Sequence, residues 1–378
     1  MRLRDYFPLG LAKGDAFCNR ENETELLVDN LKNGKHMLLV ATRRYGKSSL
    51  ALRAIKLSGL PYVEIDFYMA SNERAIEKYI LDGVVDLIGK SFGSIDKIIN
   101  SIKRYLKNLK PKLDIGSSSF KLELTVDNAV DPATNVKEAL LLLESLLEEK
   151  GVQAVMLMDE FQSVGSIAKG SGIEAAIRHV AQKTKHLTIL FSGSNRKLLA
   201  TMFEDESRPL YKLCWKMQLK RIDQKHYHDH LQKAAILAWK RKLDEEVLKE
   251  ILSLTERHPF YVNKLCDRLW SLNKKSGPTL LMVSQAWKEI IEEEKSDAIK
   301  DILLLSAGQK AVLTQIAKGA AQLTNKKTIL NLQMSSSSIM TAIEGLEEKD
   351  IIEKQGGKYQ IINPVLKHFV LKSTPEER

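Results

Sequence analysis

The sequence predicts an α/β fold on a parallel sheet, followed by a helical lid and a C-terminal winged helix. Apolar runs of strand length alternate with amphipathic helices up to about residue 222. Such alternation implies right-handed crossovers and a parallel sheet. Beyond it the pattern is purely helical, and from residue 306 three helices precede a hairpin. We therefore expect an α/β core over 1–222, a lid over 223–300, and a winged-helix domain with a short tail over 301–378.

The composition is that of a soluble protein with a basic balance. The chain has 378 residues, 44% hydrophobic and 28% charged, with a net charge of +10. No apolar run approaches the roughly 18 residues of a membrane span, and the first residues lack the apolar core of a secretory signal. The three cysteines lie far apart, without metal or disulfide spacing. We expect a cytoplasmic protein without a membrane partner, and the charge is compatible with nucleotide or nucleic acid partners.

The first half of the core reads as helix, strand, helix, strand. A helix is expected over residues 21–32, and Asn33-Gly34 after it is the signal that ends the helix. "HMLLVA" is typical of a strand buried on both faces. "SLALRAIKLSG" then predicts a helix that ends at Gly59. "YVEIDFYM" is the next expected strand.

The second half of the core continues the alternation. Residues 75–110 are expected to be mostly helical, and 112–127 to form a hairpin insertion around a Gly-Ser turn. "VKEALLLLESLLEEKG" predicts a helix, "QAVMLMDEF" a buried strand, 172–185 a helix, and "LTILFSGSN" another strand. Ligands of parallel sheets bind at the carboxyl ends of the strands. The residues of this sequence whose side chains suggest chemistry follow the expected strands at these carboxyl ends.

The last domain has the pattern of a winged helix. Helices are expected in "SAGQKAVLTQIAKG", "KKTILNLQM" and "SSSSIMTAIEGLEEKD", the last beginning with serine caps. "IIEKQGGKYQII" predicts a hairpin around Gly356-Gly357.

A phosphate-binding loop follows the first apolar strand. The pattern G-x-x-x-x-G-K-[ST] is complete at Gly46, Lys47 and Ser48, but Ala41 stands at its first glycine. If position 41 requires a positive φ, alanine costs about 1 kcal/mol; otherwise it costs almost nothing. In either case the loop is expected to bind phosphate.

Two carboxylates complete the expected site. "VMLMDEF" is an expected strand with two acidic residues at its end, and we expect this strand to neighbour the strand before the phosphate-binding loop. Asp159 is the predicted magnesium residue, and Glu160 the residue that activates the attacking water.

Five segments together resemble a known family. "FCNRENE", "RRYGKSSL", "LMDEFQ", "FSGSNR" and "SRPLY" are similar to segments of archaeal-type P-loop ATPases also found in bacteria. That family is similar to AAA+ and STAND NTPases and to archaeal origin-recognition ATPases. The resemblance covers most of residues 15–300. Relatives usually read Gly-Pro-Arg-Arg-x-Gly-Lys-Thr/Ser, from which Ala41 and Thr42 depart.

The resemblance implies an ATP or ADP site with Mg²⁺ and a slow ATPase. The implied nucleotide contacts are Asn19, Arg20, Arg43, Arg44, Tyr45, Gly46, Lys47, Ser48, Ser49, Asp159 and Pro259. Within this set Asn19 and Arg20 would lie along the adenine, and Pro259 would pack on it. Ser48 and Asp159 would hold the magnesium.

The resemblance also implies catalytic roles for Lys47, Glu160, Asn195 and Arg208. Asn195 matches a polar γ-phosphate sensor, with an ordinary helix cap as the alternative. Pro259 is equally a normal first residue of a helix. Relatives often carry an arginine finger soon after Pro-Leu-Tyr. This chain has Lys212 and Leu213 there, so Arg208 is the nearest substitute and activation by a neighbouring subunit is in doubt.

Three functional hypotheses remain open. The first is an ATP-binding and ATP-hydrolysing switch that couples nucleotide state to the winged helix. The second is a DNA-binding regulator or initiator with structural ATP. The third is a STAND-type signalling or defence scaffold that binds protein through the winged helix. "SSSSIMTAIEGLEEKD" contains no arginine, whereas base readers usually carry Arg, Lys, Asn or Gln there. Whether the chain is a monomer or a homo-oligomer is left open.

Overall fold

The structure, a computed structural model, describes residues 6–92, 102, 109–115, 120–125, 129–168, 172–273 and 276–372. Contacts divide the chain into two compact units. The sheet unit contains Arg20–Arg43 and Lys47–Leu219. The helical unit contains Met1–Asn19, Arg44–Gly46 and Lys220–Arg378. Three residues of the phosphate-binding loop therefore belong to the same unit as the lid and the winged helix.

The sheet unit is built on the expected parallel sheet. Its strands are β1 (Met37–Val40), β2 (Tyr62–Asp66), β5 (Ala154–Asp159), β6 (Leu187–Gly193) and β7 (Trp215–Gln218), in the order β2-β5-β6-β1-β7. Every pairing in this sheet is parallel. The prediction that the carboxylate strand neighbours the loop strand is wrong, because β6 lies between β1 and β5.

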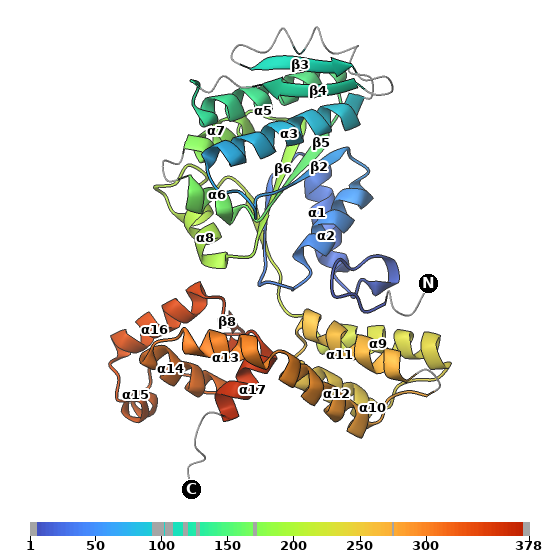
Figure 1. Ribbon diagram of the computed structural model, residues 1–378, viewed down its shortest axis with the longest axis vertical. Helices are drawn as coiled ribbons and strands as arrows, with labels where there is room; N and C mark the ends of the chain where they lie inside the picture. The colour runs from blue at the N-terminus through green and yellow to red at the C-terminus, as the bar shows by residue number, and fades with distance from the viewer. Residues whose placement is uncertain are drawn as a thin grey trace. The chain divides into compact units, whose positions relative to one another are not determined.

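The helices of this unit are α1 (Glu21–Lys32), α2 (Lys47–Ser58), α3 (Glu73–Phe92), α5 (Pro132–Lys150), α6 (Gln162–Ile167), α7 (Gly172–Ala181) and α8 (Arg196–Glu204). α3, α5 and α7 form one layer against the sheet, while α1 and α2 pack on each other and on β1 (Figure 1). α5 begins where the Asp131 side chain accepts from the Thr134 N–H, and ends at Gly151 with φ 62°.

The core of the sheet unit follows from the alternation of side chains along its strands. Leu38 and Val40 of β1 join the cluster formed with α3, α5 and α7. Met37 and Leu39 are equally buried but face the other way, because successive strand residues point to opposite faces. Full burial of each such side chain contributes about 1.5–3 kcal/mol. The sheet therefore holds the carboxyl ends of its strands rigidly.

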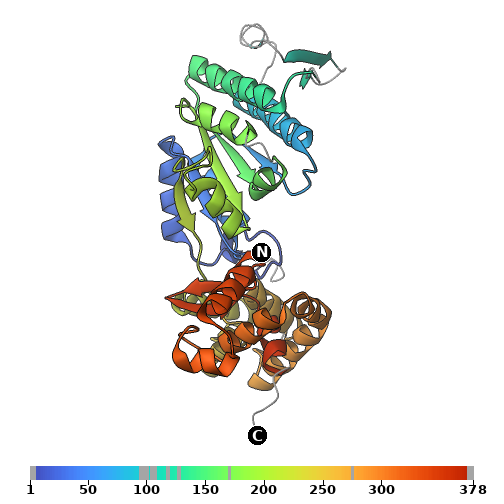
Figure 2. The same cartoon turned by 90° about the vertical axis from the view of Figure 1, so that its left-hand side faces the viewer.

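A two-stranded hairpin is attached to this layer, as the sequence predicts. β3 (Lys110–Ile115) pairs antiparallel with β4 (Phe120–Thr125), and β4 contacts α3 (Figure 2). Most of the second half of the predicted helical stretch 75–110, namely 93–101 and 103–108, lies outside the described residues.

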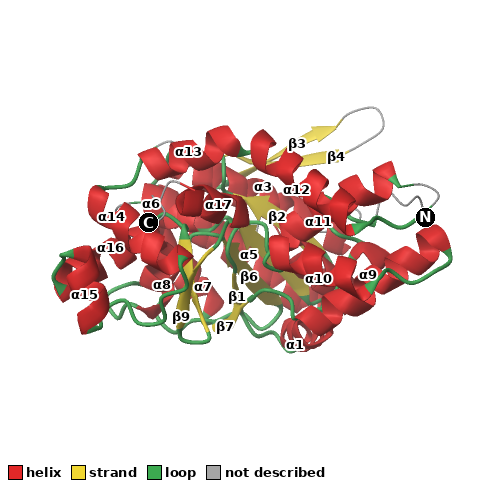
Figure 3. Ribbon diagram, turned by 90° about the horizontal axis from the view of Figure 1, so that it is seen from below, coloured by secondary structure: helices red, strands yellow, loops and turns green. Residues whose placement is uncertain are grey.

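The lid part of the helical unit consists of α9 (Gln224–Trp239), α10 (Glu245–Leu254), α11 (Pro259–Leu272), α12 (Leu280–Glu293) and α13 (Lys295–Leu303). Figure 3 shows α9 to α12 as neighbouring helices. A short 3-10 helix (Gly14–Ala16) lies near the start of the chain. No helix in the described ranges is long and apolar enough to span a membrane.

The winged helix comprises α14 (Ala307–Ala317), α15 (Lys326–Leu332), α16 (Ser336–Glu348), β8 (Ile352–Gln355), β9 (Lys358–Ile361) and α17 (Pro364–Lys372). The three helices and the hairpin follow the predicted order, and β8 pairs antiparallel with β9. Lid and winged helix share one hydrophobic core, which also contains Tyr6 and Phe7.

Candidate nucleotide-binding site

The phosphate-binding loop joins β1 to α2 through two left-handed residues. Arg44 has φ 64° and Gly46 has φ 85°. A side chain at Gly46 would meet nothing within 4 Å, so backbone conformation is what favours glycine there. Ala41 is fully buried and is not among the residues of positive φ. Alanine therefore replaces the first glycine of the motif without backbone strain.

Lys47 and Ser48, the first residues of α2, meet the end of β5. The Lys47 Nζ donates to Asp159 Oδ1 at 2.7 Å and to Glu160 Oε1 at 3.0 Å. The Ser48 hydroxyl donates to Asp159 Oδ2 at 3.1 Å. The structure thus brings together the cation, the hydroxyl and the two carboxylates that the sequence predicts for one site.

Electrostatics keep Asp159 charged although it is buried. Burial pushes the pKa of its carboxyl upward, but the Lys47 ammonium, the hydrogen bond from Lys47 and the Glu160 N–H outweigh that effect. The net result is an Asp159 pKa below its ordinary value. An ionised carboxylate beside a hydroxyl at a strand end is a donor set of the hard oxygen kind.

Glu160 is held by two residues that sequence reasoning left without a role. Its backbone has φ 49°. The Ser194 hydroxyl donates to Glu160 Oε2 at 2.9 Å, and the Gln162 amide also donates to that oxygen. The sequence signal was present, because Ser194 and Gln162 lie inside "FSGSNR" and "LMDEFQ".

Asn195 takes part in a helix cap. Its side-chain oxygen accepts from the Leu198 N–H at 3.0 Å, at the start of α8. This is the alternative that the sequence left open. The preceding residue, Ser194, contacts Glu160 through its side chain.

Arg208 pairs with a buried carboxylate. Its guanidinium donates to Glu174, a fully buried residue of α7. Burial raises the pKa of Glu174, and the Arg208 charge opposes that effect. Since removing one partner of a buried pair is costly, this contact ties Arg208 to α7.

Within the helical unit, the loop residue Tyr45 is bound by an arginine and a glutamate. Tyr45 is 1% exposed and donates from its hydroxyl to Glu353 Oε1 of β8 at 2.6 Å. Arg221 Nε donates to the Tyr45 oxygen at 2.9 Å and to Glu353 at 3.2 Å. Burial is the main reason that the Tyr45 pKa is raised. This buried group is called the Tyr45 network below.

Arg221 is the centre of that network. Its Nη1 donates to the Glu256 carbonyl at 2.8 Å, and its Nη2 to the Ile361 and Ile362 carbonyls, each at 3.0 Å. Glu256 also receives an ion pair from Lys367 of α17. The network therefore joins the loop residue Tyr45 to lid and winged helix inside one unit.

Other predicted contacts of the helical unit lie near Tyr45. The Arg44 guanidinium stacks 4.1 Å from the centre of the Phe260 ring. The His258 ring lies edge-on to Tyr45, with 5.0 Å between centroids. Burial, with Arg221 and Arg44 nearby, lowers the pKa of His258 to about 3. Pro259 is the first residue of α11, so His258 precedes that helix as a neutral ring.

The remaining predicted residues lie just before α1, in the phosphate-binding loop and in the first turn of α2. Asn19 and Arg20 are consecutive left-handed residues, with φ 58° and 75°, immediately before α1. Arg20 pairs with Glu23 at 2.8 Å. Arg43 is exposed, and Ser49 is buried in the first turn of α2.

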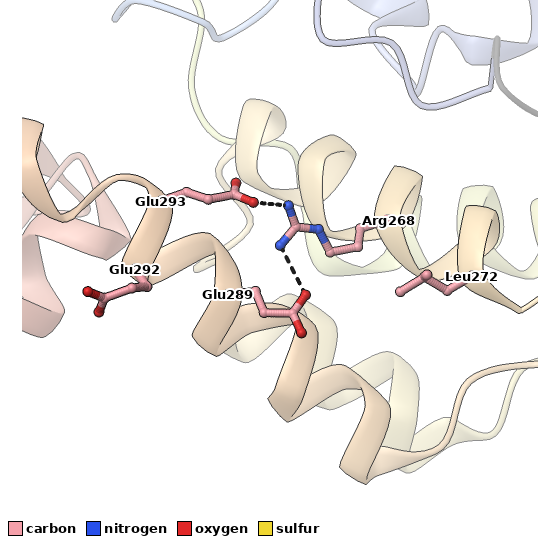
Figure 4. A pocket seen from close by; sticks show the side chains of 5 residues that line it. All are labelled: Arg268, Leu272, Glu289, Glu292 and Glu293. Atoms are coloured by element: carbon pink, nitrogen blue, oxygen red, sulfur yellow. Dashed lines mark hydrogen bonds and ion pairs between the residues drawn. The ribbon is translucent and has the colours of Figure 1, made fainter.

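A separate groove lies on the lid, away from these residues in sequence. It is lined by Arg268, Leu272, Glu289, Glu292 and Glu293 of α11 and α12 (Figure 4). Arg268 pairs with Glu289 at 3.4 Å and also with Glu293. With one guanidinium against three carboxylates, the groove has an excess of negative charge that disfavours phosphate groups.

Comparison with known proteins gives the same architecture. The family model described as "Probable winged helix domain" matches residues 300–372. A Walker-type ATPase of Pyrococcus abyssi is similar in structure, with a TM-score of 0.67, 20% identity, and coverage of 97% of this chain and 99% of that chain. No curated protein matches the sequence.

Two origin-recognition proteins of Aeropyrum pernix are also similar in structure. The ORC2 protein, solved with ADPNP and ADP, has a TM-score of 0.55 and 13% identity, covering 93% of this chain and 92% of that one. The ORC1 protein in complex with DNA has a TM-score of 0.51 and 13% identity, covering 99% and 97%. These three structures are thus a Walker-type ATPase and two ORC proteins, and this chain shares their fold, a P-loop core on a parallel sheet with a C-terminal winged helix.

Proposed function

We propose that the chain binds ATP with Mg²⁺, hydrolyses it slowly, and acts as a molecular switch coupled to its winged helix. The observation that carries the proposal is the convergence of Lys47, Ser48, Asp159 and Glu160 at the carboxyl ends of β1 and β5. These elements supply a cation for phosphate, a hydroxyl and carboxylate for a metal, and a base for water.

The donor set fits magnesium. Ser48 and Asp159 would hold the ion, since hydroxyl and ionised carboxylate oxygens are ligands that Mg²⁺ accepts. Bound there, the ion would neutralise charge on the phosphates. Lys47 binds the carboxylates in this structure, and the same ammonium would turn to the β- and γ-phosphates of a bound nucleotide.

Glu160 is the residue that would act on water. Within the described part of the chain its Oε1 contacts only Lys47, and that contact would loosen when Lys47 moves to the phosphates. The freed oxygen would then accept a hydrogen bond from the attacking water and orient it toward the γ-phosphorus. The pairing of Arg208 with Glu174 leaves no evident arginine finger in this segment, which supports slow turnover.

Substitution of Glu160 and Lys47 tests the proposal. Glu160→Gln is expected to bind ATP like the wild type and to lose nearly all hydrolysis, because the metal residue Asp159 remains. Lys47→Ala is expected to lose ATP binding itself. Calorimetric titration with Mg²⁺–ATP and phosphate release measure the two effects. Equal hydrolysis by wild type and Glu160→Gln contradicts the assignment.

Coupling to the winged helix is proposed to run through the Tyr45 network. Tyr45 lies two residues before Lys47 in the loop, and its hydroxyl contacts both Arg221 and the winged-helix residue Glu353. A movement of the loop that accompanies nucleotide binding would therefore change the contacts of β8. By linkage, a change at β8 would alter nucleotide affinity by the same factor.

Hydrogen exchange tests this coupling. In the wild type, adding Mg²⁺–ATP is expected to change amide protection in β8 and β9. In Tyr45→Phe that difference should shrink because the hydroxyl contacts are gone, while Tyr359→Phe in the same hairpin keeps it. If Tyr45→Phe responds to ATP as the wild type does, the network does not carry the coupling.

The exposed face of the winged helix favours a protein partner over duplex DNA. Along α16 the exposed residues include Glu344 and Glu348, and the helix contains no arginine. The Ser335 side chain is occupied as the cap of α16, accepting from the Ser338 N–H at 3.1 Å. Like charges would repel phosphates here. The alternative, duplex binding, is supported by the exposed wing lysines Lys354 and Lys358.

A further inference from the structure

Apart from Lys47, the side chains that donate to the Glu160 carboxylate in the described part of the chain both contact Oε2. Oε2 accepts from the Ser194 hydroxyl at 2.9 Å and from the Gln162 amide, while Oε1 faces Lys47 at 3.0 Å. Ser194 is 3% exposed and follows directly on β6, and Gln162 opens α6. The two donors thus come from the residue after β6 and the first residue of α6, and both contact the carboxylate oxygen that Lys47 does not contact.

The Gln162 side chain is itself confined. Its Oε1 is buried and has no hydrogen-bond partner in the described part of the chain, so the amide is held by its Nε2 contact and by packing. A methyl group at Gly193 would stand 2.1 Å from that oxygen. The absence of a side chain at Gly193 is what gives the amide room to reach Glu160.

We propose that Gln162 and Ser194 are positioning residues for ATP hydrolysis, which fix Glu160 Oε2 so that Oε1 is the oxygen presented to the attacking water. This inference rests on the proposed ATPase function. In the step it serves, the water oxygen bonds to the γ-phosphorus as the bond to the β-phosphate oxygen breaks. Glu160 Oε1 receives the proton that the water gives up.

The Gln162→Met variant tests the inference, because methionine keeps the length and bulk of the side chain but cannot donate. The expected result is a fall in kcat for Mg²⁺–ATP of about tenfold, as for loss of one hydrogen bond to a charged group. KM and the equilibrium affinity for ATP should stay within about twofold, since Lys47, Ser48 and Asp159 are untouched. Ser194→Ala should also lower kcat and leave KM and the affinity for ATP nearly unchanged.

Two comparisons make the test specific. Gln153→Ala, at the residue just before β5 and far along that strand from Asp159, is the control and should hydrolyse ATP at the wild-type rate. In a Glu160→Gln background, Gln162→Met should cause no further loss, because the amide acts only through that carboxylate. If Gln162→Met retains wild-type kcat, or raises it, the positioning role is overturned. If the wild type itself does not hydrolyse ATP, the proposed function fails instead.

Discussion

Arg221→Met should destabilise the helical unit strongly. Arg221 is buried, its side chain 2% exposed, and it donates to Tyr45, to Glu353 and to the Ile361 and Ile362 carbonyls. Methionine has a similar length but removes the Arg221 cation from the Glu353 carboxylate and the Arg221 donors from two buried carbonyls. Breaking a buried ion pair costs about 3–5 kcal/mol, and the carbonyls add to that value. We therefore expect a loss of at least about 3 kcal/mol in the free energy of unfolding.

Urea unfolding followed by tryptophan fluorescence measures this loss. Three of the four tryptophans, Trp239, Trp270 and Trp287, lie in the helical unit, so the signal reports mainly on it. With a urea dependence of about 1–3 kcal/mol per M, the midpoint should fall by about 1–3 M. Arg257→Met is the matched control, since Arg257 is 36% exposed and lies 3.9 Å from Asp223, and it should change little. Equal midpoints for Arg221→Met and the wild type would refute the reasoning.

Three further predictions follow from the loop, the wing and a buried histidine. Ala41→Gly should not improve ATP affinity in calorimetry, because Ala41 is free of left-handed strain and glycine has none to relieve; a tenfold gain would contradict this. Duplex DNA should bind only weakly, with a log–log salt slope of about −2 for Lys354 and Lys358, and changing both to Glu should abolish that binding in anisotropy titrations; binding unaffected by the change would place DNA elsewhere. Burial lowers the pKa of His230 from 6.5 to about 4, so its neutral form contributes stability that is complete above pH 6.5 and is lost as pH falls toward 4, by about 1.4 kcal/mol per pH unit. His230→Phe should reduce that acid loss in urea melts at pH 7 and pH 5, and an unchanged difference between the two pH values would count against the effect.

Much of the fold could be predicted because its signals are local. β1, β5 and β6 are fully buried; β1 is an unbroken apolar run, β5 is apolar up to Asp159, and β6 is mainly apolar between its Thr188 and Ser192. β7 lacks that signal, since Trp215, Lys216 and Gln218 are exposed and only Met217 is buried. An edge strand with a single buried residue shows no hydrophobic pattern that distinguishes it from a loop.

The site was predictable in its motifs but not in its contacts. Lys47, Ser48, Asp159 and Glu160 follow from sequence spacing together with the rule for strand ends. The choice between Ser194 and Asn195 depends on where β6 ends and α8 begins, to within one residue. No local pattern indicates the contact between Arg221 and Glu353, which are 132 residues apart.

The assignment of Arg44–Gly46 to the helical unit has a consequence for how this protein can be divided. The winged helix matches a family model of its own over residues 300–372 and looks like an exchangeable module. Yet a chain cut before residue 300 would leave Tyr45 and Arg221 without Glu353 and without the two carbonyls after β9. A winged helix transplanted from another protein would have to bring the equivalent glutamate with it. Replacing the wing in this chain therefore requires redesign of the contacts of Tyr45 and Arg221 at the same time.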